Sequence, residues 1–243
     1  VHILRAESPG PQVGRLVTKM KASSRILYLI YIILTLILTL ILWIGPDMNL
    51  YESLVYAFGT AGTGGFAIAS DSIAAYSAYS QYVIAIFMII FGVNFTIYYL
   101  FLIGNVKEIV KNDEFKWYLC IVAISVVFVC LSIYSIYQNL ELTFRNSFFQ
   151  VASIISTSGF TTVDYTKWPT LALMIIFILM LIGSCAGSTA GGMKCSRIVI
   201  LAKSTLKKIK AMINPRKVET IKMDGKTITD DMVLSVNSFM SMY

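Results

Sequence analysis

The chain has 243 residues, of which 57% are hydrophobic and 14% are charged, and its mean hydropathy is +0.74. Soluble globular domains carry about a quarter charged residues, so this composition excludes a soluble protein and indicates an integral membrane protein. The net charge is +7. The four cysteines lack C-x-x-C spacing, which argues against a disulfide framework or a zinc site.

The first half of the chain predicts one compact membrane unit over residues 25–106. An uncharged apolar run at 26–44 matches the roughly 20 residues that cross a bilayer as a helix. Residues 50–61 are too few to cross, which is typical of a re-entrant helix. A polar glycine-containing loop follows at 62–66, and a second uncharged run at 82–106 predicts another spanning helix.

The second half repeats this order over residues 117–202. A spanning helix is expected at 117–137, a re-entrant helix at 142–155 and a polar loop at 156–160. Residues 168–202 form an apolar segment whose second half is rich in glycine and serine, which predicts a broken helix. The sequence therefore predicts an all-α integral membrane fold with two tandem units, each a helix, a re-entrant pore helix, a filter loop and a second helix.

The basic residues are distributed as a topology signal. Eighteen of the twenty Lys and Arg lie before residue 26, between residues 106 and 117, or after residue 193. This is the positive-inside pattern. It predicts a cytoplasmic linker at 1–24, cytoplasmic loops at 107–116 and 203–229, and a multi-pass plasma-membrane protein in which both ends of each unit are cytoplasmic. The same distribution argues against nucleic-acid binding and leaves contact with anionic lipid as a secondary interpretation.

The two ends are expected to be cuts within a longer protein. The chain opens with Val1 and has no short apolar signal segment. Residues 230–243 form a mildly apolar run that is expected to begin a further transmembrane helix.

A short phrase, T-x-G-F, occurs at Thr63–Phe66 and again at Thr157–Phe160. Irregular backbone at membrane depth is tolerated only where it lines water or protein, and glycine allows consecutive carbonyls to point at one axis. Ordinary turns would explain one copy, but two copies in register after half-length helices favour an ion pathway. The predicted filter residues are Gly62, Thr63, Gly64, Gly65, Ser156, Thr157, Ser158 and Gly159.

The absence of acidic residues from both loops disfavours a divalent-selective carboxylate ring. The C-terminal dipole of each re-entrant helix would face the pathway, which favours cations. The helical runs 26–44, 82–106 and 117–137 contain no charged group, which disfavours an ion-coupled secondary transporter. Neither paired intramembrane Asp nor a His-rich helical motif is present, so an intramembrane enzyme is not expected.

The stretch Gly183–Gly192 contains four glycines, two serines and a threonine, which weaken a helix. From these residues alone, an intramembrane loop and a kinked, closely packed helix remain equally open.

Three phrases, Ala61–Phe66, Ser156–Thr162 and Gly183–Lys194, resemble the Trk/Ktr/HKT superfamily of potassium transporters, and most closely its bacterial TrkH branch. The resemblance covers nearly the whole chain. It implies a pseudo-fourfold pore of four such units in one polypeptide, of which this chain matches the second and third. Gly65 and Gly159 match the family's key filter glycines, which favours potassium; sodium or non-selective monovalent cation transport is the alternative, because members with serine at such a position tend to pass sodium.

The resemblance also implies a gate below the filter. Its predicted residues are Gly183, Gly187, Ser188, Thr189, Gly191 and Gly192. Asn94 is expected to hydrogen-bond neighbouring helices or the gate, with a role as ion ligand disfavoured. Lys194 and Arg197 are expected either to anchor the inner surface or to contact acidic groups as the gate moves.

The expected partners are membrane lipid, the remaining pore units, a second copy in a homodimer and a cytoplasmic nucleotide-binding regulatory subunit resembling TrkA. No cofactor is expected; potassium is the transported ion.

Overall fold

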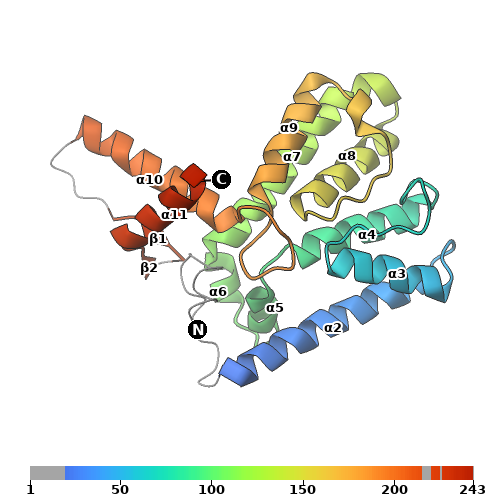
Figure 1. Cartoon of the computed structure of the whole chain (residues 1–243), viewed down its shortest axis with the longest axis horizontal. Helices are drawn as coiled ribbons and strands as arrows, with labels where there is room; N and C mark the ends of the chain where they lie inside the picture. The colour runs from blue at the N-terminus through green and yellow to red at the C-terminus, as the bar shows by residue number, and fades with distance from the viewer. Residues whose placement is uncertain (1–19, 215–219, 225, 243) are drawn as a thin grey trace.

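The computed structural model describes residues 20–214, 220–224 and 226–242. Most of the expected linker at 1–24 lies outside the described residues. Helices dominate (Figure 1). In chain order they are α2 (Met20–Ile44), α3 (Leu50–Ala61), α4 (Ala78–Phe91), α5 (Phe95–Leu102), α6 (Val106–Lys111), α7 (Asp113–Tyr137), α8 (Leu140–Ile155), α9 (Thr170–Ile182), α10 (Cys195–Ile213) and α11 (Asp230–Met242), with a 3-10 turn at Tyr165–Lys167. A small antiparallel hairpin pairs β1 (Lys222–Met223) with β2 (Lys226–Thr227).

Two of the described helices, α2 from Arg25 onward and α7, are long and apolar enough to cross a membrane. Only 28% of the most apolar window of each is buried inside the chain. The outward faces carry large apolar side chains such as Leu36 on α2 and Leu131 on α7. Apolar surface of this extent is stable against lipid tails or against further protein, which agrees with the membrane fold predicted from composition.

The expected continuous helix over 82–106 is wrong. The structure ends α4 at Phe91, begins α5 at Phe95, and bends the pair by 90°. The cause lies in the polar residues at the break: the Asn94 side chain accepts a 2.9 Å hydrogen bond from the backbone N–H of Thr96 and caps α5. Gly92 fits there because a Cβ would lie 2.4 Å from the Tyr118 hydroxyl. Hydropathy alone could not reveal this bend.

Two loop boundaries also differ from expectation. The predicted loop at 107–116 contains most of α6 and the first turn of α7. The predicted loop at 203–229 begins as helix, since α10 continues to Ile213. Charged residues in helices at a membrane surface cannot be distinguished from loop residues by composition, which explains both differences.

The half-length helices α3 and α8 are surrounded by longer ones. Helix α3 packs against α2 and α4, and α8 packs against α4, α7 and α9. The last turns of α8 are the most enclosed, with residues 149–156 all buried. Both helices start at an asparagine N-cap, Asn49 for α3 and Asn139 for α8. These caps fix where each half-length helix begins. Together with the helix length, they fix the position of the loop that follows its C-terminus.

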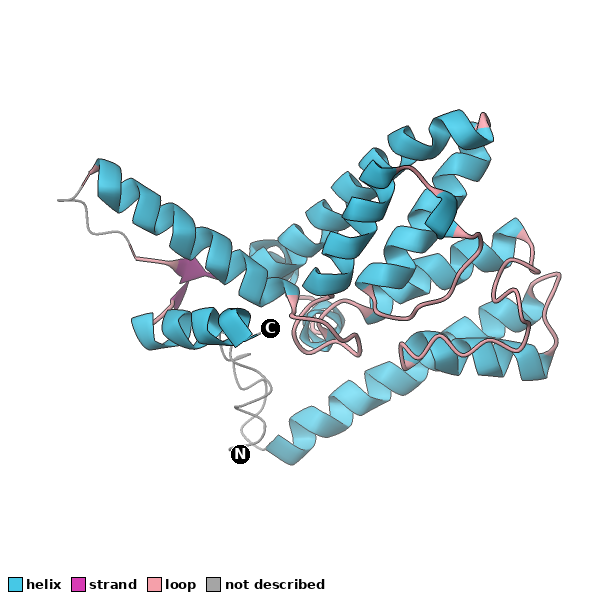
Figure 2. Cartoon of the chain, turned by 45° about the horizontal axis from the view of Figure 1, so that its top comes forward, coloured by secondary structure: helices cyan, strands magenta, loops and turns pink. Residues whose placement is uncertain are grey.

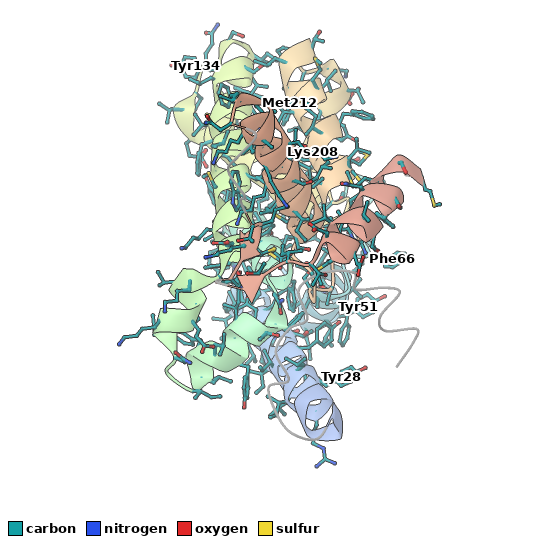
Figure 3. The ribbon with its side chains drawn as sticks, turned by 90° about the vertical axis from the view of Figure 1, so that its left-hand side faces the viewer. Tyr28, Tyr51, Phe66, Tyr134, Lys208 and Met212 are labelled. Atoms are coloured by element: carbon teal, nitrogen blue, oxygen red, sulfur yellow. The ribbon has the colours of Figure 1, made fainter. Side chains whose placement is uncertain are left out.

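The C-terminal elements form a separate small core. Helix α10, the hairpin and α11 bury the side chains of Ile200, Ile221, Met223, Ile228, Val233 and Val236 against one another. Figures 1 and 2 show this group at one end of the molecule, with the second half of α10 projecting beyond the other helices. Lys208 and Met212, labelled in Figure 3, lie on that projecting half.

The cap of α3 can be tested by Asn49→Ala. Its Oδ1 accepts from the Glu52 N–H at 2.9 Å, and Glu52 Oε2 accepts from the Asn49 N–H at 3.0 Å. Loss of such a reciprocal cap costs about 1 kcal/mol, so we expect a lower apparent Tm for the intact protein in detergent. Asn105→Ala is the matched control, because Asn105 starts α6 without a side-chain cap bond. Equal Tm changes for the two variants would contradict the assignment.

Candidate functional site

The first loop predicted to be part of a filter, residues 62–66, follows α3 directly and is called the first filter loop below. It turns its backbone N–H groups back toward that helix. The N–H of Gly62 donates to the Phe58 carbonyl at 2.9 Å, and that of Gly64 donates to the Gly59 carbonyl at 2.9 Å. Thr63 and Gly65 have φ of +50° and +64°. Alternate residues therefore take left-handed conformations, a backbone path that glycine adopts freely and that strains a β-branched threonine.

The second filter loop repeats this geometry after α8. The N–H of Ser156 donates to the Ala152 carbonyl at 3.1 Å, and that of Ser158 donates to the Ser153 carbonyl at 3.0 Å. Thr157 and Gly159 have φ of +57° and +84°. Each of these positions lies 94 residues after its counterpart in the first loop. The sequence repeat is therefore also a repeat of backbone conformation.

This bonding leaves the carbonyl oxygens of both loops available. Within the described residues, no N–H or side-chain donor bonds to the carbonyls of residues 62–65 or 156–159. Gly62, Gly64 and Gly159 are exposed on the surface of this chain. A backbone carbonyl away from bulk water needs a partner, so these oxygens are chemically suited to coordinate a cation.

The two loops lie side by side. A Cβ on Gly65 would meet the Ser158 carbonyl oxygen at 2.0 Å, so the backbones approach as closely as glycine allows. Just after the loops, the Thr161 N–H donates to Ser72 Oγ at 3.2 Å, and the Ile73 N–H donates to the Thr161 carbonyl at 3.1 Å. The ring of Phe160 packs 6.0 Å from that of Tyr56 on α3.

The glycine-rich stretch forms a loop, residues 183–194, between α9 and α10. The kinked helix that the sequence also allowed is not formed. Gly183 and Gly192 have φ of +69° and +77°, and their backbones touch: a Cβ on Gly192 would lie 2.8 Å from the Gly183 Cα. The two ends of the loop therefore lie in contact, and only glycine fits at these two positions without moving the neighbouring backbone.

The glycine-rich loop contacts both filter loops. Thr63 Oγ1 donates to the Thr189 carbonyl at 3.2 Å. The Gly191 N–H donates to Thr157 Oγ1 at 2.7 Å. The same threonine of each repeated phrase thus bonds to the loop, which lies directly against the two filters.

The other side of the loop rests on the bend between α4 and α5. The Cys185 N–H donates to the Gly92 carbonyl at 3.0 Å, and the Phe95 N–H donates to the Gly187 carbonyl at 3.1 Å. Asn94 lies against the loop, with its Oδ1 3.1 Å from where a Gly187 Cβ would be. Its side-chain bond goes to Thr96, so Asn94 shapes the bend on which the loop rests.

The basic residues at the end of the loop bond to loop carbonyls. Lys194 Nζ donates to the Ala190 carbonyl. Arg197, which is buried, donates to the Met193 carbonyl at 3.2 Å, and its guanidinium lies 4.0 Å from the Phe239 ring centre. Ser188 Oγ donates to the Cys185 carbonyl at 2.6 Å. Both basic side chains therefore contact the loop itself.

Sequence reasoning missed Glu114, which it counted within a charged loop. The structure buries this carboxylate in the first turn of α7, 5% exposed. Its Oε1 accepts from the Ala186 N–H at 2.6 Å and from the Ser196 N–H at 3.1 Å. The available signal was the helix-start pattern Asn112-Asp113-Glu114, which places Glu114 on a helix and not in solvent.

Comparison with known proteins agrees with this geometry. The model of the TrkH cation transport protein family matches residues 4–243. The chain is 30% identical to the Trk system potassium uptake protein TrkH of Escherichia coli K12 and 28% identical to TrkG of the same strain, covering 100% and 99% of this chain but 51% and 50% of those proteins. The crystal structure of the potassium transporter TrkH from Vibrio parahaemolyticus superposes with a TM-score of 0.86 at 29% identity, over 94% of this chain and 50% of that one.

The chain thus spans about half the length of the curated relatives it matches. The chain belongs to the TrkH family of cation transport proteins.

Proposed function

We propose that this chain supplies two of the pore units of a potassium-uptake protein, with residues 62–65 and 156–159 as parts of its selectivity filter. The observation that carries the proposal is the repeated backbone geometry. Every bonded N–H of the two loops turns toward its own pore helix, and no donor in the described part of the chain bonds to their carbonyl oxygens. Rings of such oxygens replace the water shell of potassium without a fixed charge that would trap the ion.

The pore helices add a field of the right sign. Helices α3 and α8 both end at a filter loop, at Ala61 and Ile155. The C-terminus of a helix carries about half a negative charge. Two such ends beside adjacent loops favour a monovalent cation over an anion, and the loops contain no carboxylate that would hold a divalent ion strongly.

The phenylalanines of the two phrases support the presence of further pore units. Phe160 is fully buried against Tyr56 of the preceding unit, whereas Phe66, labelled in Figure 3, is 74% exposed. If the units follow one another around an axis, Phe66 packs against the pore helix of another unit as Phe160 packs here. The full pathway then needs units outside this chain, as the half-length match also suggests.

The loop of residues 183–194 is proposed as the gate. Its bonds to Thr63 and Thr157, one in each filter loop, support this proposal. The positive-inside distribution supports an orientation with α6 and α10 on the cytoplasmic side. Membrane lipid would cover the apolar faces of α2 and α7. A second copy and a TrkA-like nucleotide-binding subunit are the partners that family membership suggests.

The filter assignment is tested by Gly65→Asp in the intact protein. A carboxylate placed beside Ser158 would obstruct the loop contact and bind cations too strongly to release them, because conduction requires weak binding. We expect rubidium uptake to be lost while the protein still inserts in the membrane, measured by isotope influx and by membrane fractionation. Unchanged rubidium influx would refute the assignment.

A finer test compares Gly65→Ala with Gly159→Ala. Both positions have positive φ, so both variants carry similar backbone strain of about 1–2 kcal/mol. At Gly65 the new Cβ would meet the Ser158 carbonyl oxygen of the following unit, whereas nothing in the described part of this chain lies within 4 Å of a Cβ at Gly159. If the units follow one another around an axis, a Cβ at Gly159 meets the next unit in the same way, so we expect both variants to lower the rubidium-to-sodium permeability ratio. Gly104→Ala is the matched control, because Gly104 has φ of +78° and open space where a Cβ would lie; a ratio in Gly65→Ala equal to that in Gly104→Ala would contradict the side-by-side packing of the loops.

The gate contact is tested by Thr157→Val, with Thr157→Ser as its matched control. Valine keeps the shape but removes the hydroxyl that accepts from Gly191, and serine keeps the hydroxyl. A lost hydrogen bond costs about 1 kcal/mol, so we expect rubidium influx at fixed driving force to rise about fivefold in the valine variant. The serine variant should stay near the unsubstituted protein. An equal rise in both variants would contradict the assignment, because serine keeps the hydroxyl that accepts from Gly191.

A further inference from the structure

One buried carboxylate joins the two ends of the glycine-rich loop. Glu114 Oε1 accepts from the N–H of Ala186, at the loop's beginning, and from the N–H of Ser196, in the first turn of α10. These two donors bracket residues 187–195. No other side chain in the described part of the chain hydrogen-bonds to backbone on both sides of that segment.

The carboxylate is held in place by its own helix. Asn112 caps α7 by accepting from the Phe115 N–H at 2.7 Å, which fixes the turn that carries Glu114. Glu114 also lies at the N-terminus of α10, where unpaired N–H groups and the helix dipole favour a negative charge. The carboxyl group of Glu114 therefore satisfies two backbone N–H groups, one at the start of the loop and one in the first turn of α10.

Further bonds hold the start of α7. Asp224, from the hairpin region, accepts from the Asp113 N–H at 2.7 Å, and Asp113 pairs with Lys203 of α10 at 2.7 Å. The start of α7 is thus bonded to the loop, to α10 and to the residues after α10.

The position of the loop depends on these anchors. Its filter side is held by two threonine hydroxyls, and its base is held by Glu114. The loop cannot leave the filters as a unit unless its base separates from α7 or deforms between the two donors. The anchor therefore controls how readily the loop departs.

We propose that Glu114 is a positioning residue for gating: its carboxylate holds the glycine-rich loop against the filter loops, and release of Ala186 and Ser196 accompanies opening. This inference rests on the proposed function of that loop as the gate. It assigns a regulatory role to a residue that touches no ion.

The test uses the intact protein with Glu114→Ala, Glu114→Gln and, as matched control, Glu108→Ala. Glu108 is an exposed carboxylate on α6, near in sequence and without contact to the loop. Rubidium influx should rise about tenfold in Glu114→Ala, which corresponds to about 1.4 kcal/mol. It should rise less in Glu114→Gln, because the amide oxygen has two lone pairs and can still accept from both N–H groups. Glu108→Ala should match the unsubstituted protein, and the rubidium-to-sodium ratio should stay unchanged in all of them.

A second measurement does not depend on transport. Cys185 lies on the loop and is fully buried, and Cys130 on α7 is half-buried and away from it. Modification by N-ethylmaleimide, followed by mass spectrometry at each cysteine, should be faster at Cys185 in Glu114→Ala and unchanged at Cys130. Only variants that elute like the unsubstituted protein in gel filtration are compared; if alanine prevents folding, the glutamine variant carries the test.

The outcomes separate the inference from the proposed function. If neither influx nor Cys185 reactivity differs between the Glu114 variants and Glu108→Ala, the inference is overturned. A changed ion ratio without faster Cys185 modification would also overturn it, by placing the effect in the filter. Absence of rubidium influx in the unsubstituted protein would refute the proposed function, while faster Cys185 modification would still support the anchor.

Discussion

The structure depends on how backbone polar groups are satisfied at membrane depth. A loop among apolar helices must find partners for every N–H and carbonyl. Here the N–H groups of each filter loop bond to the last turns of the pore helix that precedes it, at Phe58 to Thr60 and at Ala152 to Ile154. Left-handed conformations at Thr63 and Gly65, and at Thr157 and Gly159, make this bonding possible. The carbonyl oxygens of the two loops then accept no bond from the described residues. The chemistry of the site follows from this difference between the bonded N–H groups and the unbonded carbonyls.

The same constraint explains why the filter and the glycine-rich loop are packed together. Both are irregular segments, and each supplies partners that the other lacks: a threonine hydroxyl for the Gly191 N–H and a Thr189 carbonyl for a threonine hydroxyl. The bend at Gly92 supplies a further carbonyl for Cys185. Four irregular segments, the two filter loops, the glycine-rich loop and the bend, therefore supply hydrogen-bond partners to one another, and none would be stable alone in lipid.

Much of the fold could be predicted from the sequence. The all-helical membrane fold was predicted from hydropathy, from the lengths of the apolar runs and from the repeat of T-x-G-F, and it is confirmed by the match to the TrkH structure. The bend within 82–106 could not be predicted from hydropathy, because Gly92 and Asn94 cost little in an average over 25 apolar residues. The preference of glycine and asparagine for helix ends is visible in the sequence. Only the contacts of Gly92 with Tyr118 and of Asn94 with Gly187 show that the helix breaks there.

For the candidate site, the sequence singled out three segments that the structure brings into contact, and it missed how they are joined. The repeated phrases pointed to both filter loops, and the glycines pointed to the loop at 183–194. Glu114 was overlooked because a carboxylate beside Lys111 and Lys116 looks solvated in sequence. Its burial results from tertiary packing of α7 against α10, which local sequence patterns do not reveal.

Helix α10 has a geometric consequence of its own. It begins at Cys195, directly after the glycine-rich loop, and continues without a break to Ile213. Its length is about 28 Å, so a tilt of about 10° around its first turn would sweep the far end through about 5 Å. If the helix moves as one rigid element, a small rearrangement beside the glycine-rich loop would become a larger displacement of Lys208 and Met212.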